Sequence, residues 1–519
     1  MRRSRVTVGC CVLVLLALSV PVAGSESVAP GKLAVPLLFV QTPLAMEAAG
    51  ERIAVLAADG QVHVLTSEFH AAADPCVSFD GEQVLFAGRR HEGDGWEIWQ
   101  MQADGTGKRQ VTHNQADARR PVWLAPAAVN APSFDHKIPW IAFTSTAAGV
   151  WDERRHSPLA NLYAMSLAPV GERGTVLWQT TYGLGGDRTP TVLADGRVLF
   201  ASWQRQGYGL MTISWAGENL NPFYGSHDGT LSQLSPVALP APSRDIVFVE
   251  VAGDNEMQGG RLAAVSMRRP LHSWRLLADD GAYRTPAVLP QGGLVVAWRA
   301  TAAASFGLYA FDEIAGRGDV LVDDPAWHET QHAPLAPRME PRGRIPTVDF
   351  ASVLDVKGFE QAGQLQCLNV YESDRETLSG VEQGSIKRVR LVEGIPMRIA
   401  VSAGEADGAD SPSNGGTVDV WPPPTVQTRS LGEAPVEADG SFYVNVAGDR
   451  PFYIESLDEA GTVVAAMRAW IWVRAGDQRG CVGCHENKEM TPENRVTDAL
   501  RRARPMSLMG DTQPAAEEP

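Results

Sequence analysis

The sequence has little basic charge, no apolar run long enough to cross a membrane, and few stretches with the periodicity of an amphipathic helix. Lysine and arginine total 45 against 61 acidic residues, which gives a formal net charge of −16. Nucleic acids and anionic lipid surfaces bind basic patches, so we expect neither as a partner. The uncharged run Val6–Val22 is shorter than the roughly 20 residues of a transmembrane helix.

The first 24 residues have the three parts of a secretory signal peptide. Three arginines among the first five residues precede the uncharged run, and Val22-Ala23-Gly24 provides the small residues of a cleavage site. We expect cleavage after Gly24 and export to the periplasm or the medium, with no integral membrane segment in the mature chain. Cys10 and Cys11 would leave with the peptide. A retained N-terminal anchor is the alternative.

A proline followed by a short apolar strand recurs along the first two thirds of the chain, in which glycine and proline are abundant. The six copies are centred on Pro75, Pro121, Pro190, Pro236, Pro286 and Pro334. Their spacings are 46, 69, 46, 50 and 48 residues, and the long interval holds an insertion with three further prolines. A period in the forties is typical of four-stranded propeller blades.

The sixth copy has only its first strand before the repeat ends. The three strands that would complete it are found near the other end of the mature chain, at Leu37–Gln41, Ile53–Ala57 and Val62–Thr66. Sharing one blade between the two ends of the domain closes the ring and leaves no open strand edge. We therefore predict a six-bladed β-propeller over residues 30–345, with a row of unrelated sandwich strands as the alternative.

From about residue 346 the period stops, and alternating strands interrupted by a glycine-rich stretch follow. The clearest strands are at Ile386–Val392, Phe442–Val446, Phe452–Leu457 and Val463–Val473. They predict a small β-sandwich-like domain over residues 346–475. We expect a short C-terminal segment over residues 476–505 and a disordered tail over residues 506–519. The predicted fold class is all-β.

The C-terminal segment contains Cys481-Val482-Gly483-Cys484-His485, the spacing that attaches a c-type haem. Two thiols three positions apart each add to one vinyl group of a porphyrin, and the next histidine binds the iron. The sequence thus predicts one covalent haem c held by Cys481 and Cys484, with His485 as an axial ligand. Two alternative interpretations remain, a metal site that includes His485 and a redox dithiol. A metal site would need a second ligand pair, and a redox dithiol would need a thioredoxin-like context, and neither follows in the sequence.

The second axial ligand of the iron has several candidates. We favour His332 and Met506, and the other donors are His328, Met490 and Met509. Iron with two protein ligands indicates electron transfer, whereas an open position indicates catalysis or ligand sensing.

Two further features need an interpretation. His328-Glu329-Thr330-Gln331-His332 matches the zinc-protease pattern HExxH, but that site requires a helix. Pro325 and Pro334 bracket this segment, and the repeat assigns it to a loop. Cys76 and Cys367 are the other cysteines of the mature chain. They could pair, remain separate buried thiols, or bind a metal beside the haem.

Two stretches together resemble one known family. Asp74–Gly81, together with the blade repeats, looks like the TolB-type propeller. Pro435–Phe442, Leu457–Gly461 and Met467–Trp470 lead into the CxxCH motif in an order that resembles proteins related to the hydrazine synthase alpha subunit. The resemblance implies a propeller followed by a domain that carries haem c. In hydrazine synthase itself, the resemblance implies that a tyrosine just after the CxxCH motif binds the haem iron and that the histidine of the motif is involved with zinc.

This sequence departs from hydrazine synthase in two places. Residues 486–495 contain no tyrosine, and Glu489 stands near the expected position. The CxxCH motif occurs once, whereas the synthase subunit has a second haem. We therefore do not expect hydrazine synthesis, and only the architecture and the three motif residues carry over.

Three functions fit these observations. The leading hypothesis is a periplasmic redox protein that uses the propeller as a platform and exchanges single electrons with a redox protein partner. The second is an enzyme whose haem iron has an open position facing the propeller. The third is a binding module whose CxxCH holds a metal or has no redox role, since a propeller fold alone implies no reaction.

Overall fold

The structure is a computed structural model that describes residues 33–44, 50–125, 138–167, 175–204, 207–225, 231–290, 292–343, 362–373, 380–399, 426–484, 491–502 and 504–509. Nearly all regular elements in these residues are strands, which confirms the all-β prediction. The described residues include three short 3₁₀ helices, at Glu256–Gln258, Pro270–His272 and Ala499–Arg501. None of the described helices is long and apolar enough to span a membrane. The predicted signal peptide, residues 1–24, lies outside the described residues.

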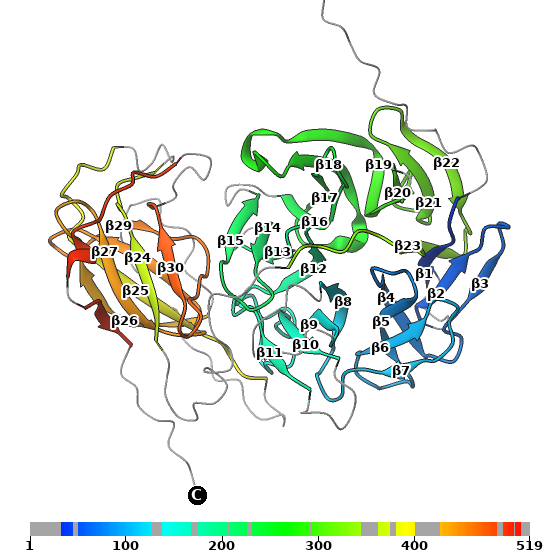
Figure 1. Cartoon of the computed structure of the whole chain (residues 1–519), viewed down its shortest axis with the longest axis horizontal. Coiled ribbons are helices and arrows are strands. Elements are labelled where there is room, and N and C mark those ends of the chain that lie inside the picture. The colour runs from blue at the N-terminus through cyan, green and yellow to red at the C-terminus, as the bar shows by residue number, and fades with distance from the viewer. Residues whose placement is uncertain are drawn as a thin grey trace, which may run out of the picture.

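Six four-stranded blades form the propeller (Figure 1). Blades 1 to 3 contain, in order, β4 (Ala71–Val77), β5 (Gln83–Arg89), β6 (Glu97–Gln102) and β7 (Arg109–Gln110); β8 (Arg119–Leu124), β9 (Trp140–Ser145), β10 (Asn161–Ser166) and β11 (Leu177–Gln179); and β12 (Asp187–Val192), β13 (Val198–Trp203), β14 (Tyr208–Ile213) and β15 (Asn221–Tyr224). Blades 4 and 5 share the long strand β19 (Arg275–Val288), which pairs first with β18 and then with β20. Their other strands are β16 (Leu231–Ala238), β17 (Asp245–Ala252), β18 (Gly260–Ser266), β20 (Leu294–Arg299), β21 (Gly307–Asp312) and β22 (Gly316–Val322).

Blade 6 joins the two ends of the propeller. Its inner strand β23 (Trp327–Pro334) pairs antiparallel with β1 (Leu37–Pro43), which continues through β2 (Arg52–Leu56) to β3 (Val62–Val64). The predicted sharing of one blade is therefore confirmed. Closure matters physically because an open ring would expose the backbone groups of two strand edges.

Each inner strand contains a β-bulge at the same place, which explains the recurring proline. The strand register shifts there, and the residue at the shift has a positive φ. These residues are Asp74 (56°), Arg120 (55°), Thr189 (46°), Ser235 (52°), Thr285 (40°) and Gln331 (48°). Proline fits the next position because the bulge removes the ladder partner of that N–H, and proline has no N–H.

The sixth repeat differs from the prediction. Gln331 has the positive φ, so His332 and not Pro334 occupies the position of the repeat proline. The distance from Pro286 to His332 is 332 − 286 = 46 residues, the same spacing as in two other repeats. The alignment on Pro334 was therefore wrong by two residues, because the residue that marks the repeat is replaced by histidine.

Hydrogen bonds connect the bulge residues from one blade to the next. Four backbone N–H groups at the bulges donate to side-chain oxygens of the neighbouring blade over 2.8 to 3.2 Å. The pairs are Asp74 to Gln331, Arg120 to Asp74, Ser235 to Thr189, and Gln331 to Thr285. A bulge leaves an N–H without a ladder partner, and a polar side chain from the preceding blade satisfies it. These polar residues thus hold neighbouring inner strands together at the centre of the propeller.

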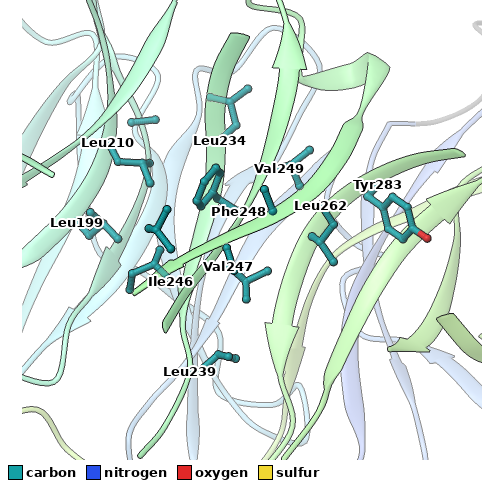
Figure 2. Packing of buried hydrophobic residues seen from close by; sticks show 14 of the residues in the cluster. Leu199, Leu210, Leu234, Leu239, Ile246, Val247, Phe248, Val249, Leu262 and Tyr283 are labelled. Carbon is teal, nitrogen blue, oxygen red and sulfur yellow. The ribbon is translucent and has the colours of Figure 1, made fainter. Parts of the chain in front are cut away.

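Apolar side chains fill the space between neighbouring blades. Figure 2 shows one such cluster, in which Phe248 and Val249 of β17 lie with Leu199 and Leu210 of blade 3. Burial stabilises such residues by about 25 cal/mol per Å² of apolar surface. Both faces of a blade are covered by its neighbours. The sequence of β17 is therefore almost continuously apolar and does not alternate strictly between apolar and polar residues.

The C-terminal domain is a sandwich of two four-stranded sheets. The first has the order β30 (Gln478–Cys481), β24 (Ala362–Cys367), β27 (Phe442–Ala447) and β31 (Met506–Leu508). The second has the order β26 (Gln427–Pro435), β25 (Arg388–Ile395), β28 (Phe452–Leu457) and β29 (Val463–Ala466). Buried residues of both sheets, such as Leu365, Val444 and Leu391, form its core.

Two boundaries in this domain differ from the prediction. Residues 478–481, which the prediction assigned to a separate segment 476–505, belong to the sandwich, because they form β30 and extend the first sheet in parallel to β24. Residues 506–508 are not part of a disordered tail, because β31 pairs in parallel with β27 at the other edge. Parallel neighbours need long connections, so local alternation along the chain does not reveal them. Residues 510–519 lie outside the described part.

The sandwich lies beside the propeller and packs on loops of blades 2 and 3 (Figure 1). Trp472 enters a buried cluster whose other tryptophans are Trp140, Trp178 and Trp215. The Trp470 Nε1–H donates to Glu153 Oε2 over 2.7 Å, and Arg474 Nη1 donates to the Gln179 carbonyl over 2.7 Å. Buried aromatic surface and buried hydrogen bonds therefore fix this domain on the propeller.

Candidate functional site

The CxxC motif lies at one edge of the sandwich. Cys481 is the last residue of the edge strand β30, and Cys484 lies in the bend that follows. Both side chains are half-buried and pack against the sandwich core. The Sγ of Cys484 is 3.8 Å from the Oγ of Ser456 in β28, which belongs to the other sheet. The motif thus crosses from the first sheet to the second.

Gly483 is required by the close approach of two backbones. A Cβ at this position would lie 2.1 Å from the carbonyl oxygen of Glu372, which is too close for any side chain. A backbone hydrogen bond of 2.9 Å from the Leu368 N–H to the Cys481 carbonyl holds the same two segments together. The position of the motif is therefore set by the chain that follows β24.

The residues present fit a covalent haem c. Two half-buried thiols stand three residues apart, one at the end of an edge strand and the other in the bend that follows, and at this spacing each can bond one vinyl group of a porphyrin. Cys367, in contrast, is only 3% exposed. Cys481 and Cys484 would hold the group. His485 and Met490 lie outside the described residues.

The structure places His332 and Met506 away from the motif. His332 lies in β23, buried in the propeller, with its Nε2 2.7 Å from the Val295 carbonyl oxygen. Burial lowers the pKa of His332 to about 4. Met506 lies in β31, at the opposite edge of the sheet from β30. Three strand spacings of about 4.8 Å put these edges about 14 Å apart. Met509 follows β31, and His328 lies in β23 with His332.

The HExxH segment is a strand, neither the predicted loop nor the helix that a zinc protease needs. His328 Nδ1 accepts a hydrogen bond from the Phe306 N–H over 3.0 Å. Glu329 is buried, burial raises its pKa to about 8, and its Oε1 accepts from Gln41 Nε2 over 3.3 Å. These side chains therefore contribute to the packing of blade 6.

Cys76 and Cys367 belong to different domains. Cys76 lies in β4 of blade 1, where its carbonyl accepts from Trp123 Nε1 over 3.1 Å. Cys367 lies in β24 of the sandwich, directly opposite Cys481. Cys76 packs against the cluster between blades 1 and 2, whereas Cys367 lies in the sandwich core, so the two are not joined by a disulfide in this structure. Among the described residues no group of three or more side chains could hold a metal ion.

A second charged region, at the centre of the propeller, was missed in the sequence. Three arginines are the last residues to pair with the neighbouring strand before the bulge of their inner strand. They are Arg119, Arg188 and Arg284, and they therefore occupy equivalent positions in blades 2, 3 and 5. Glu256 reaches this region from the loop between β17 and β18, where its Oε2 is 2.5 Å from Arg120 Nη2. Burial opposes its ionisation, but Arg120 and Arg284 outweigh burial and lower the pKa of Glu256 to about 2.

A cavity of about 60 Å³ lies beside one of these arginines, Arg188. Asp187 is buried in the wall of this cavity, and burial raises its pKa to about 6. Hydrogen bonds from Thr181 and Asn161 to Asp187 Oδ2 act in the opposite direction and lower the pKa. Its Oδ1 has no hydrogen-bond partner in the described part of the chain. The other lining residues are Asp152, Ser157, Pro158, Ala160, Gly185, Gly186, Arg188 and Tyr208. Such a site suits a small polar molecule that donates a hydrogen bond to Asp187.

One signal could have found this region. Arginine stands two positions before the repeat proline three times, as Arg119-Arg120-Pro121, Arg188-Thr189-Pro190 and Arg284-Thr285-Pro286. A charge that recurs at one position of a repeat is brought to one level of the folded ring.

Two sequence comparisons show similarity to the alpha subunit of hydrazine synthase. Residues 384–486 match the hydrazine synthase alpha subunit middle domain. Hydrazine synthase subunit alpha from Kuenenia stuttgartiensis is 29% identical over 505 residues, covering 82% of this chain and 61% of that protein. The chain therefore spans less than two thirds of the length of this relative.

The solved structure of hydrazine synthase agrees with the sequence match. Hydrazine synthase from Kuenenia stuttgartiensis matches with a TM-score of 0.77 and 26% identity, covering 90% of this chain and 71% of that chain. TolB from Acinetobacter baumannii matches with a TM-score of 0.42 and 14% identity, over 58% of this chain and 67% of that chain. In sequence and in fold, the chain resembles the alpha subunit of hydrazine synthase, as its motifs predict.

Proposed function

We propose that this chain is an exported redox protein that carries one haem c, bound covalently through Cys481 and Cys484 with His485 as an axial ligand. The observation that carries the proposal is the pair of half-buried thiols, three residues apart, at the open edge of the sandwich. This motif lies at the end of the segment that matches the hydrazine synthase middle domain. Haem c would supply one-electron redox chemistry there.

The rest of the chain would hold this group on a rigid platform. Trp472 and the hydrogen bond from Trp470 to Glu153 attach the sandwich to blades 2 and 3. The contact of Gly483 with Glu372 fixes the motif on the sandwich. A redox site held this firmly needs little rearrangement when its charge changes, which favours electron exchange over a conformational role.

A protein partner and export complete the proposal. The net charge of −16 favours a basic redox partner, and the similar protein is named a subunit, which supports binding to another protein. Export is supported by the signal-like pattern of residues 1–24. Covalent haem attachment also takes place outside the cytoplasm.

A second candidate is a binding function of the propeller, in which the CxxCH holds a metal or has no redox role. The cavity at Asp187 favours it, because a buried carboxyl oxygen without a partner is poised to accept a hydrogen bond from a ligand. If this is the main function, a small-molecule screen by thermal shift should find ligands that stabilise the wild-type chain and fail to stabilise Asp187→Asn.

Mass spectrometry tests the leading proposal. The chain is produced with haem-maturation machinery, and denatured protein is weighed after acid and organic extraction. We expect one added haem per chain, lost in the Cys481→Ala/Cys484→Ala double variant and kept in Cys76→Ala, the matched cysteine control in blade 1. A matured wild-type chain without haem mass would overturn the proposal.

A further inference from the structure

We propose that Cys367 forms a disulfide with Cys481 when the motif carries no haem. This assigns a covalent modification site to the buried cysteine of the sandwich. It also gives Cys481 two alternative bonds, a disulfide to Cys367 or a thioether to a porphyrin. The disulfide itself is independent of the proposed function, and only the competition with haem rests on it.

The register of the first sheet carries the proposal. In the parallel pair β24 and β30, Cys367 stands directly opposite Cys481. Neighbouring strands lie about 4.8 Å apart, and disulfides join residues whose Cα atoms are about 4.4 to 6.8 Å apart. Directly paired residues project to the same face of a sheet, and both side chains contact the same apolar core. The backbone thus already has the separation that the bond requires.

The alternative partner, Cys484, is directed elsewhere. Its Sγ lies near Ser456 of the opposite sheet. A bond between Cys481 and Cys484 would require the intervening turn to change, but Gly483 is held against the backbone of Glu372. In the folded chain Cys367 is therefore the better placed thiol, although it is 114 residues away in sequence (481 − 367 = 114).

Access to the two thiols sets the order of the steps. Cys367 is buried in the core, whereas Cys481 is half-buried at the end of an edge strand of four residues. The Cys481 thiolate attacks the disulfide of an oxidant such as oxidised glutathione, forming a mixed disulfide and releasing one thiol. Cys367, as thiolate, then attacks the Cys481 sulfur and releases the second thiol. The protein loses two electrons and two protons, and the oxidant disulfide becomes two thiols.

The disulfide would control haem attachment. Thioether formation needs the Cys481 thiol, so the oxidised chain cannot accept a porphyrin at this residue until the bond is reduced. Replacing Cys367 would remove this competing bond and leave both thiols of the motif in place.

Peptide mapping tests the proposal on the full chain produced without haem-maturation machinery. The folded protein is incubated with oxidised glutathione, its remaining thiols are alkylated, and it is digested without reduction. We expect a peptide that links Cys367 to Cys481, with Cys484 and Cys76 alkylated. Cys76→Ala should leave the link unchanged. Cys367→Ala, which suits the apolar core better than serine, should abolish it and leave Cys481 alkylated or glutathionylated.

Two results would overturn the proposal. One is a Cys481–Cys484 link in the wild-type chain, and the other is alkylation of Cys481 after full oxidation while Cys367 reacts only upon unfolding. Maturation of the oxidised chain then tests the competition: haem attachment should require a reductant in the wild type and not in Cys367→Ala. A chain that forms the disulfide but never binds haem would refute the proposed function and leave the disulfide intact.

Discussion

The propeller repeats one four-stranded unit six times, whereas the sandwich is assembled from strands that are far apart in the chain. Most propeller strands pair with their sequence neighbour, and the contact of β1 with β23 joins the two ends. In the sandwich, β24 pairs with β27 and β30, and β31 adds to the other edge. The platform is thus built from local contacts, and the candidate redox site depends on a few long-range ones.

The two regions also differ in the chemistry that they bury. The centre of the propeller holds charges, with Arg120 paired to Glu256 and Asp187 beside a cavity. The edge of the sandwich holds thiols against an apolar core. Variants in one region should therefore affect charge and pH dependence, and variants in the other should affect covalent and redox behaviour.

The largest effect is expected where the two regions meet. Trp472→Ala removes a buried aromatic ring from the tryptophan cluster between the domains. Such a change costs about 3 to 5 kcal/mol, so we expect separate unfolding of the two domains in calorimetry and faster proteolysis between them. The exposed Trp274 is the control; Trp274→Ala should change stability by about 0.5 kcal/mol or less. A single unchanged transition in Trp472→Ala would contradict the docking described above.

A pH-dependent effect is expected in the propeller. The pKa of Asp187 is about 6 in the folded chain against an ordinary value of 3.8. A raised pKa means that the folded state holds the proton more tightly, so stability falls as the pH rises from about 4 through 6. Asp187→Asn removes this dependence, which amounts to about 3 kcal/mol for a shift of this size. Denaturant unfolding at pH 4 and pH 8 should show it, and parallel pH profiles of the two proteins would refute it.

A steric effect is expected at the motif. In Gly483→Ala the new Cβ would meet the carbonyl oxygen of Glu372, and overpacking of this kind costs about 1 to 3 kcal/mol. Thermal melting should report the loss in the sandwich and not in the propeller. Gly380→Ala is the matched control, because a Cβ there has nothing within 4 Å. Equal melting curves for the two variants would contradict the close approach at Gly483.

The smallest effect tests the symmetry of the propeller. Thr189→Val removes the acceptor for the Ser235 N–H, and Thr285→Val removes the acceptor for the Gln331 N–H. Valine and threonine are both β-branched, so the backbone strain at these positive-φ positions is unchanged. Each variant should lose about 1 kcal/mol in denaturant unfolding. Clearly different losses would show that the two bonds are not equivalent.

The parts of the molecule that the sequence predicts are those with local signals. Bulge prolines and apolar strands recur with a fixed period, so the propeller and its closure by β1 to β3 could be predicted. His332 broke that signal, because histidine replaced the repeat proline and shifted the alignment to Pro334. The CxxC motif was readable because both thiols belong to one short segment. The pairing of Cys367 with Cys481 was not, because parallel pairing across 114 residues leaves no local pattern.

The most direct test of the account is a spectroelectrochemical titration of the matured chain. The sandwich edge, not the propeller centre, is proposed to hold the redox group. We expect a reversible reduced-minus-oxidised difference spectrum that corresponds to one electron per chain. It should be unchanged in Asp187→Asn and absent in the Cys481→Ala/Cys484→Ala variant. A wild-type chain with no redox-dependent spectrum, or a spectrum that survives removal of both cysteines, would contradict the account.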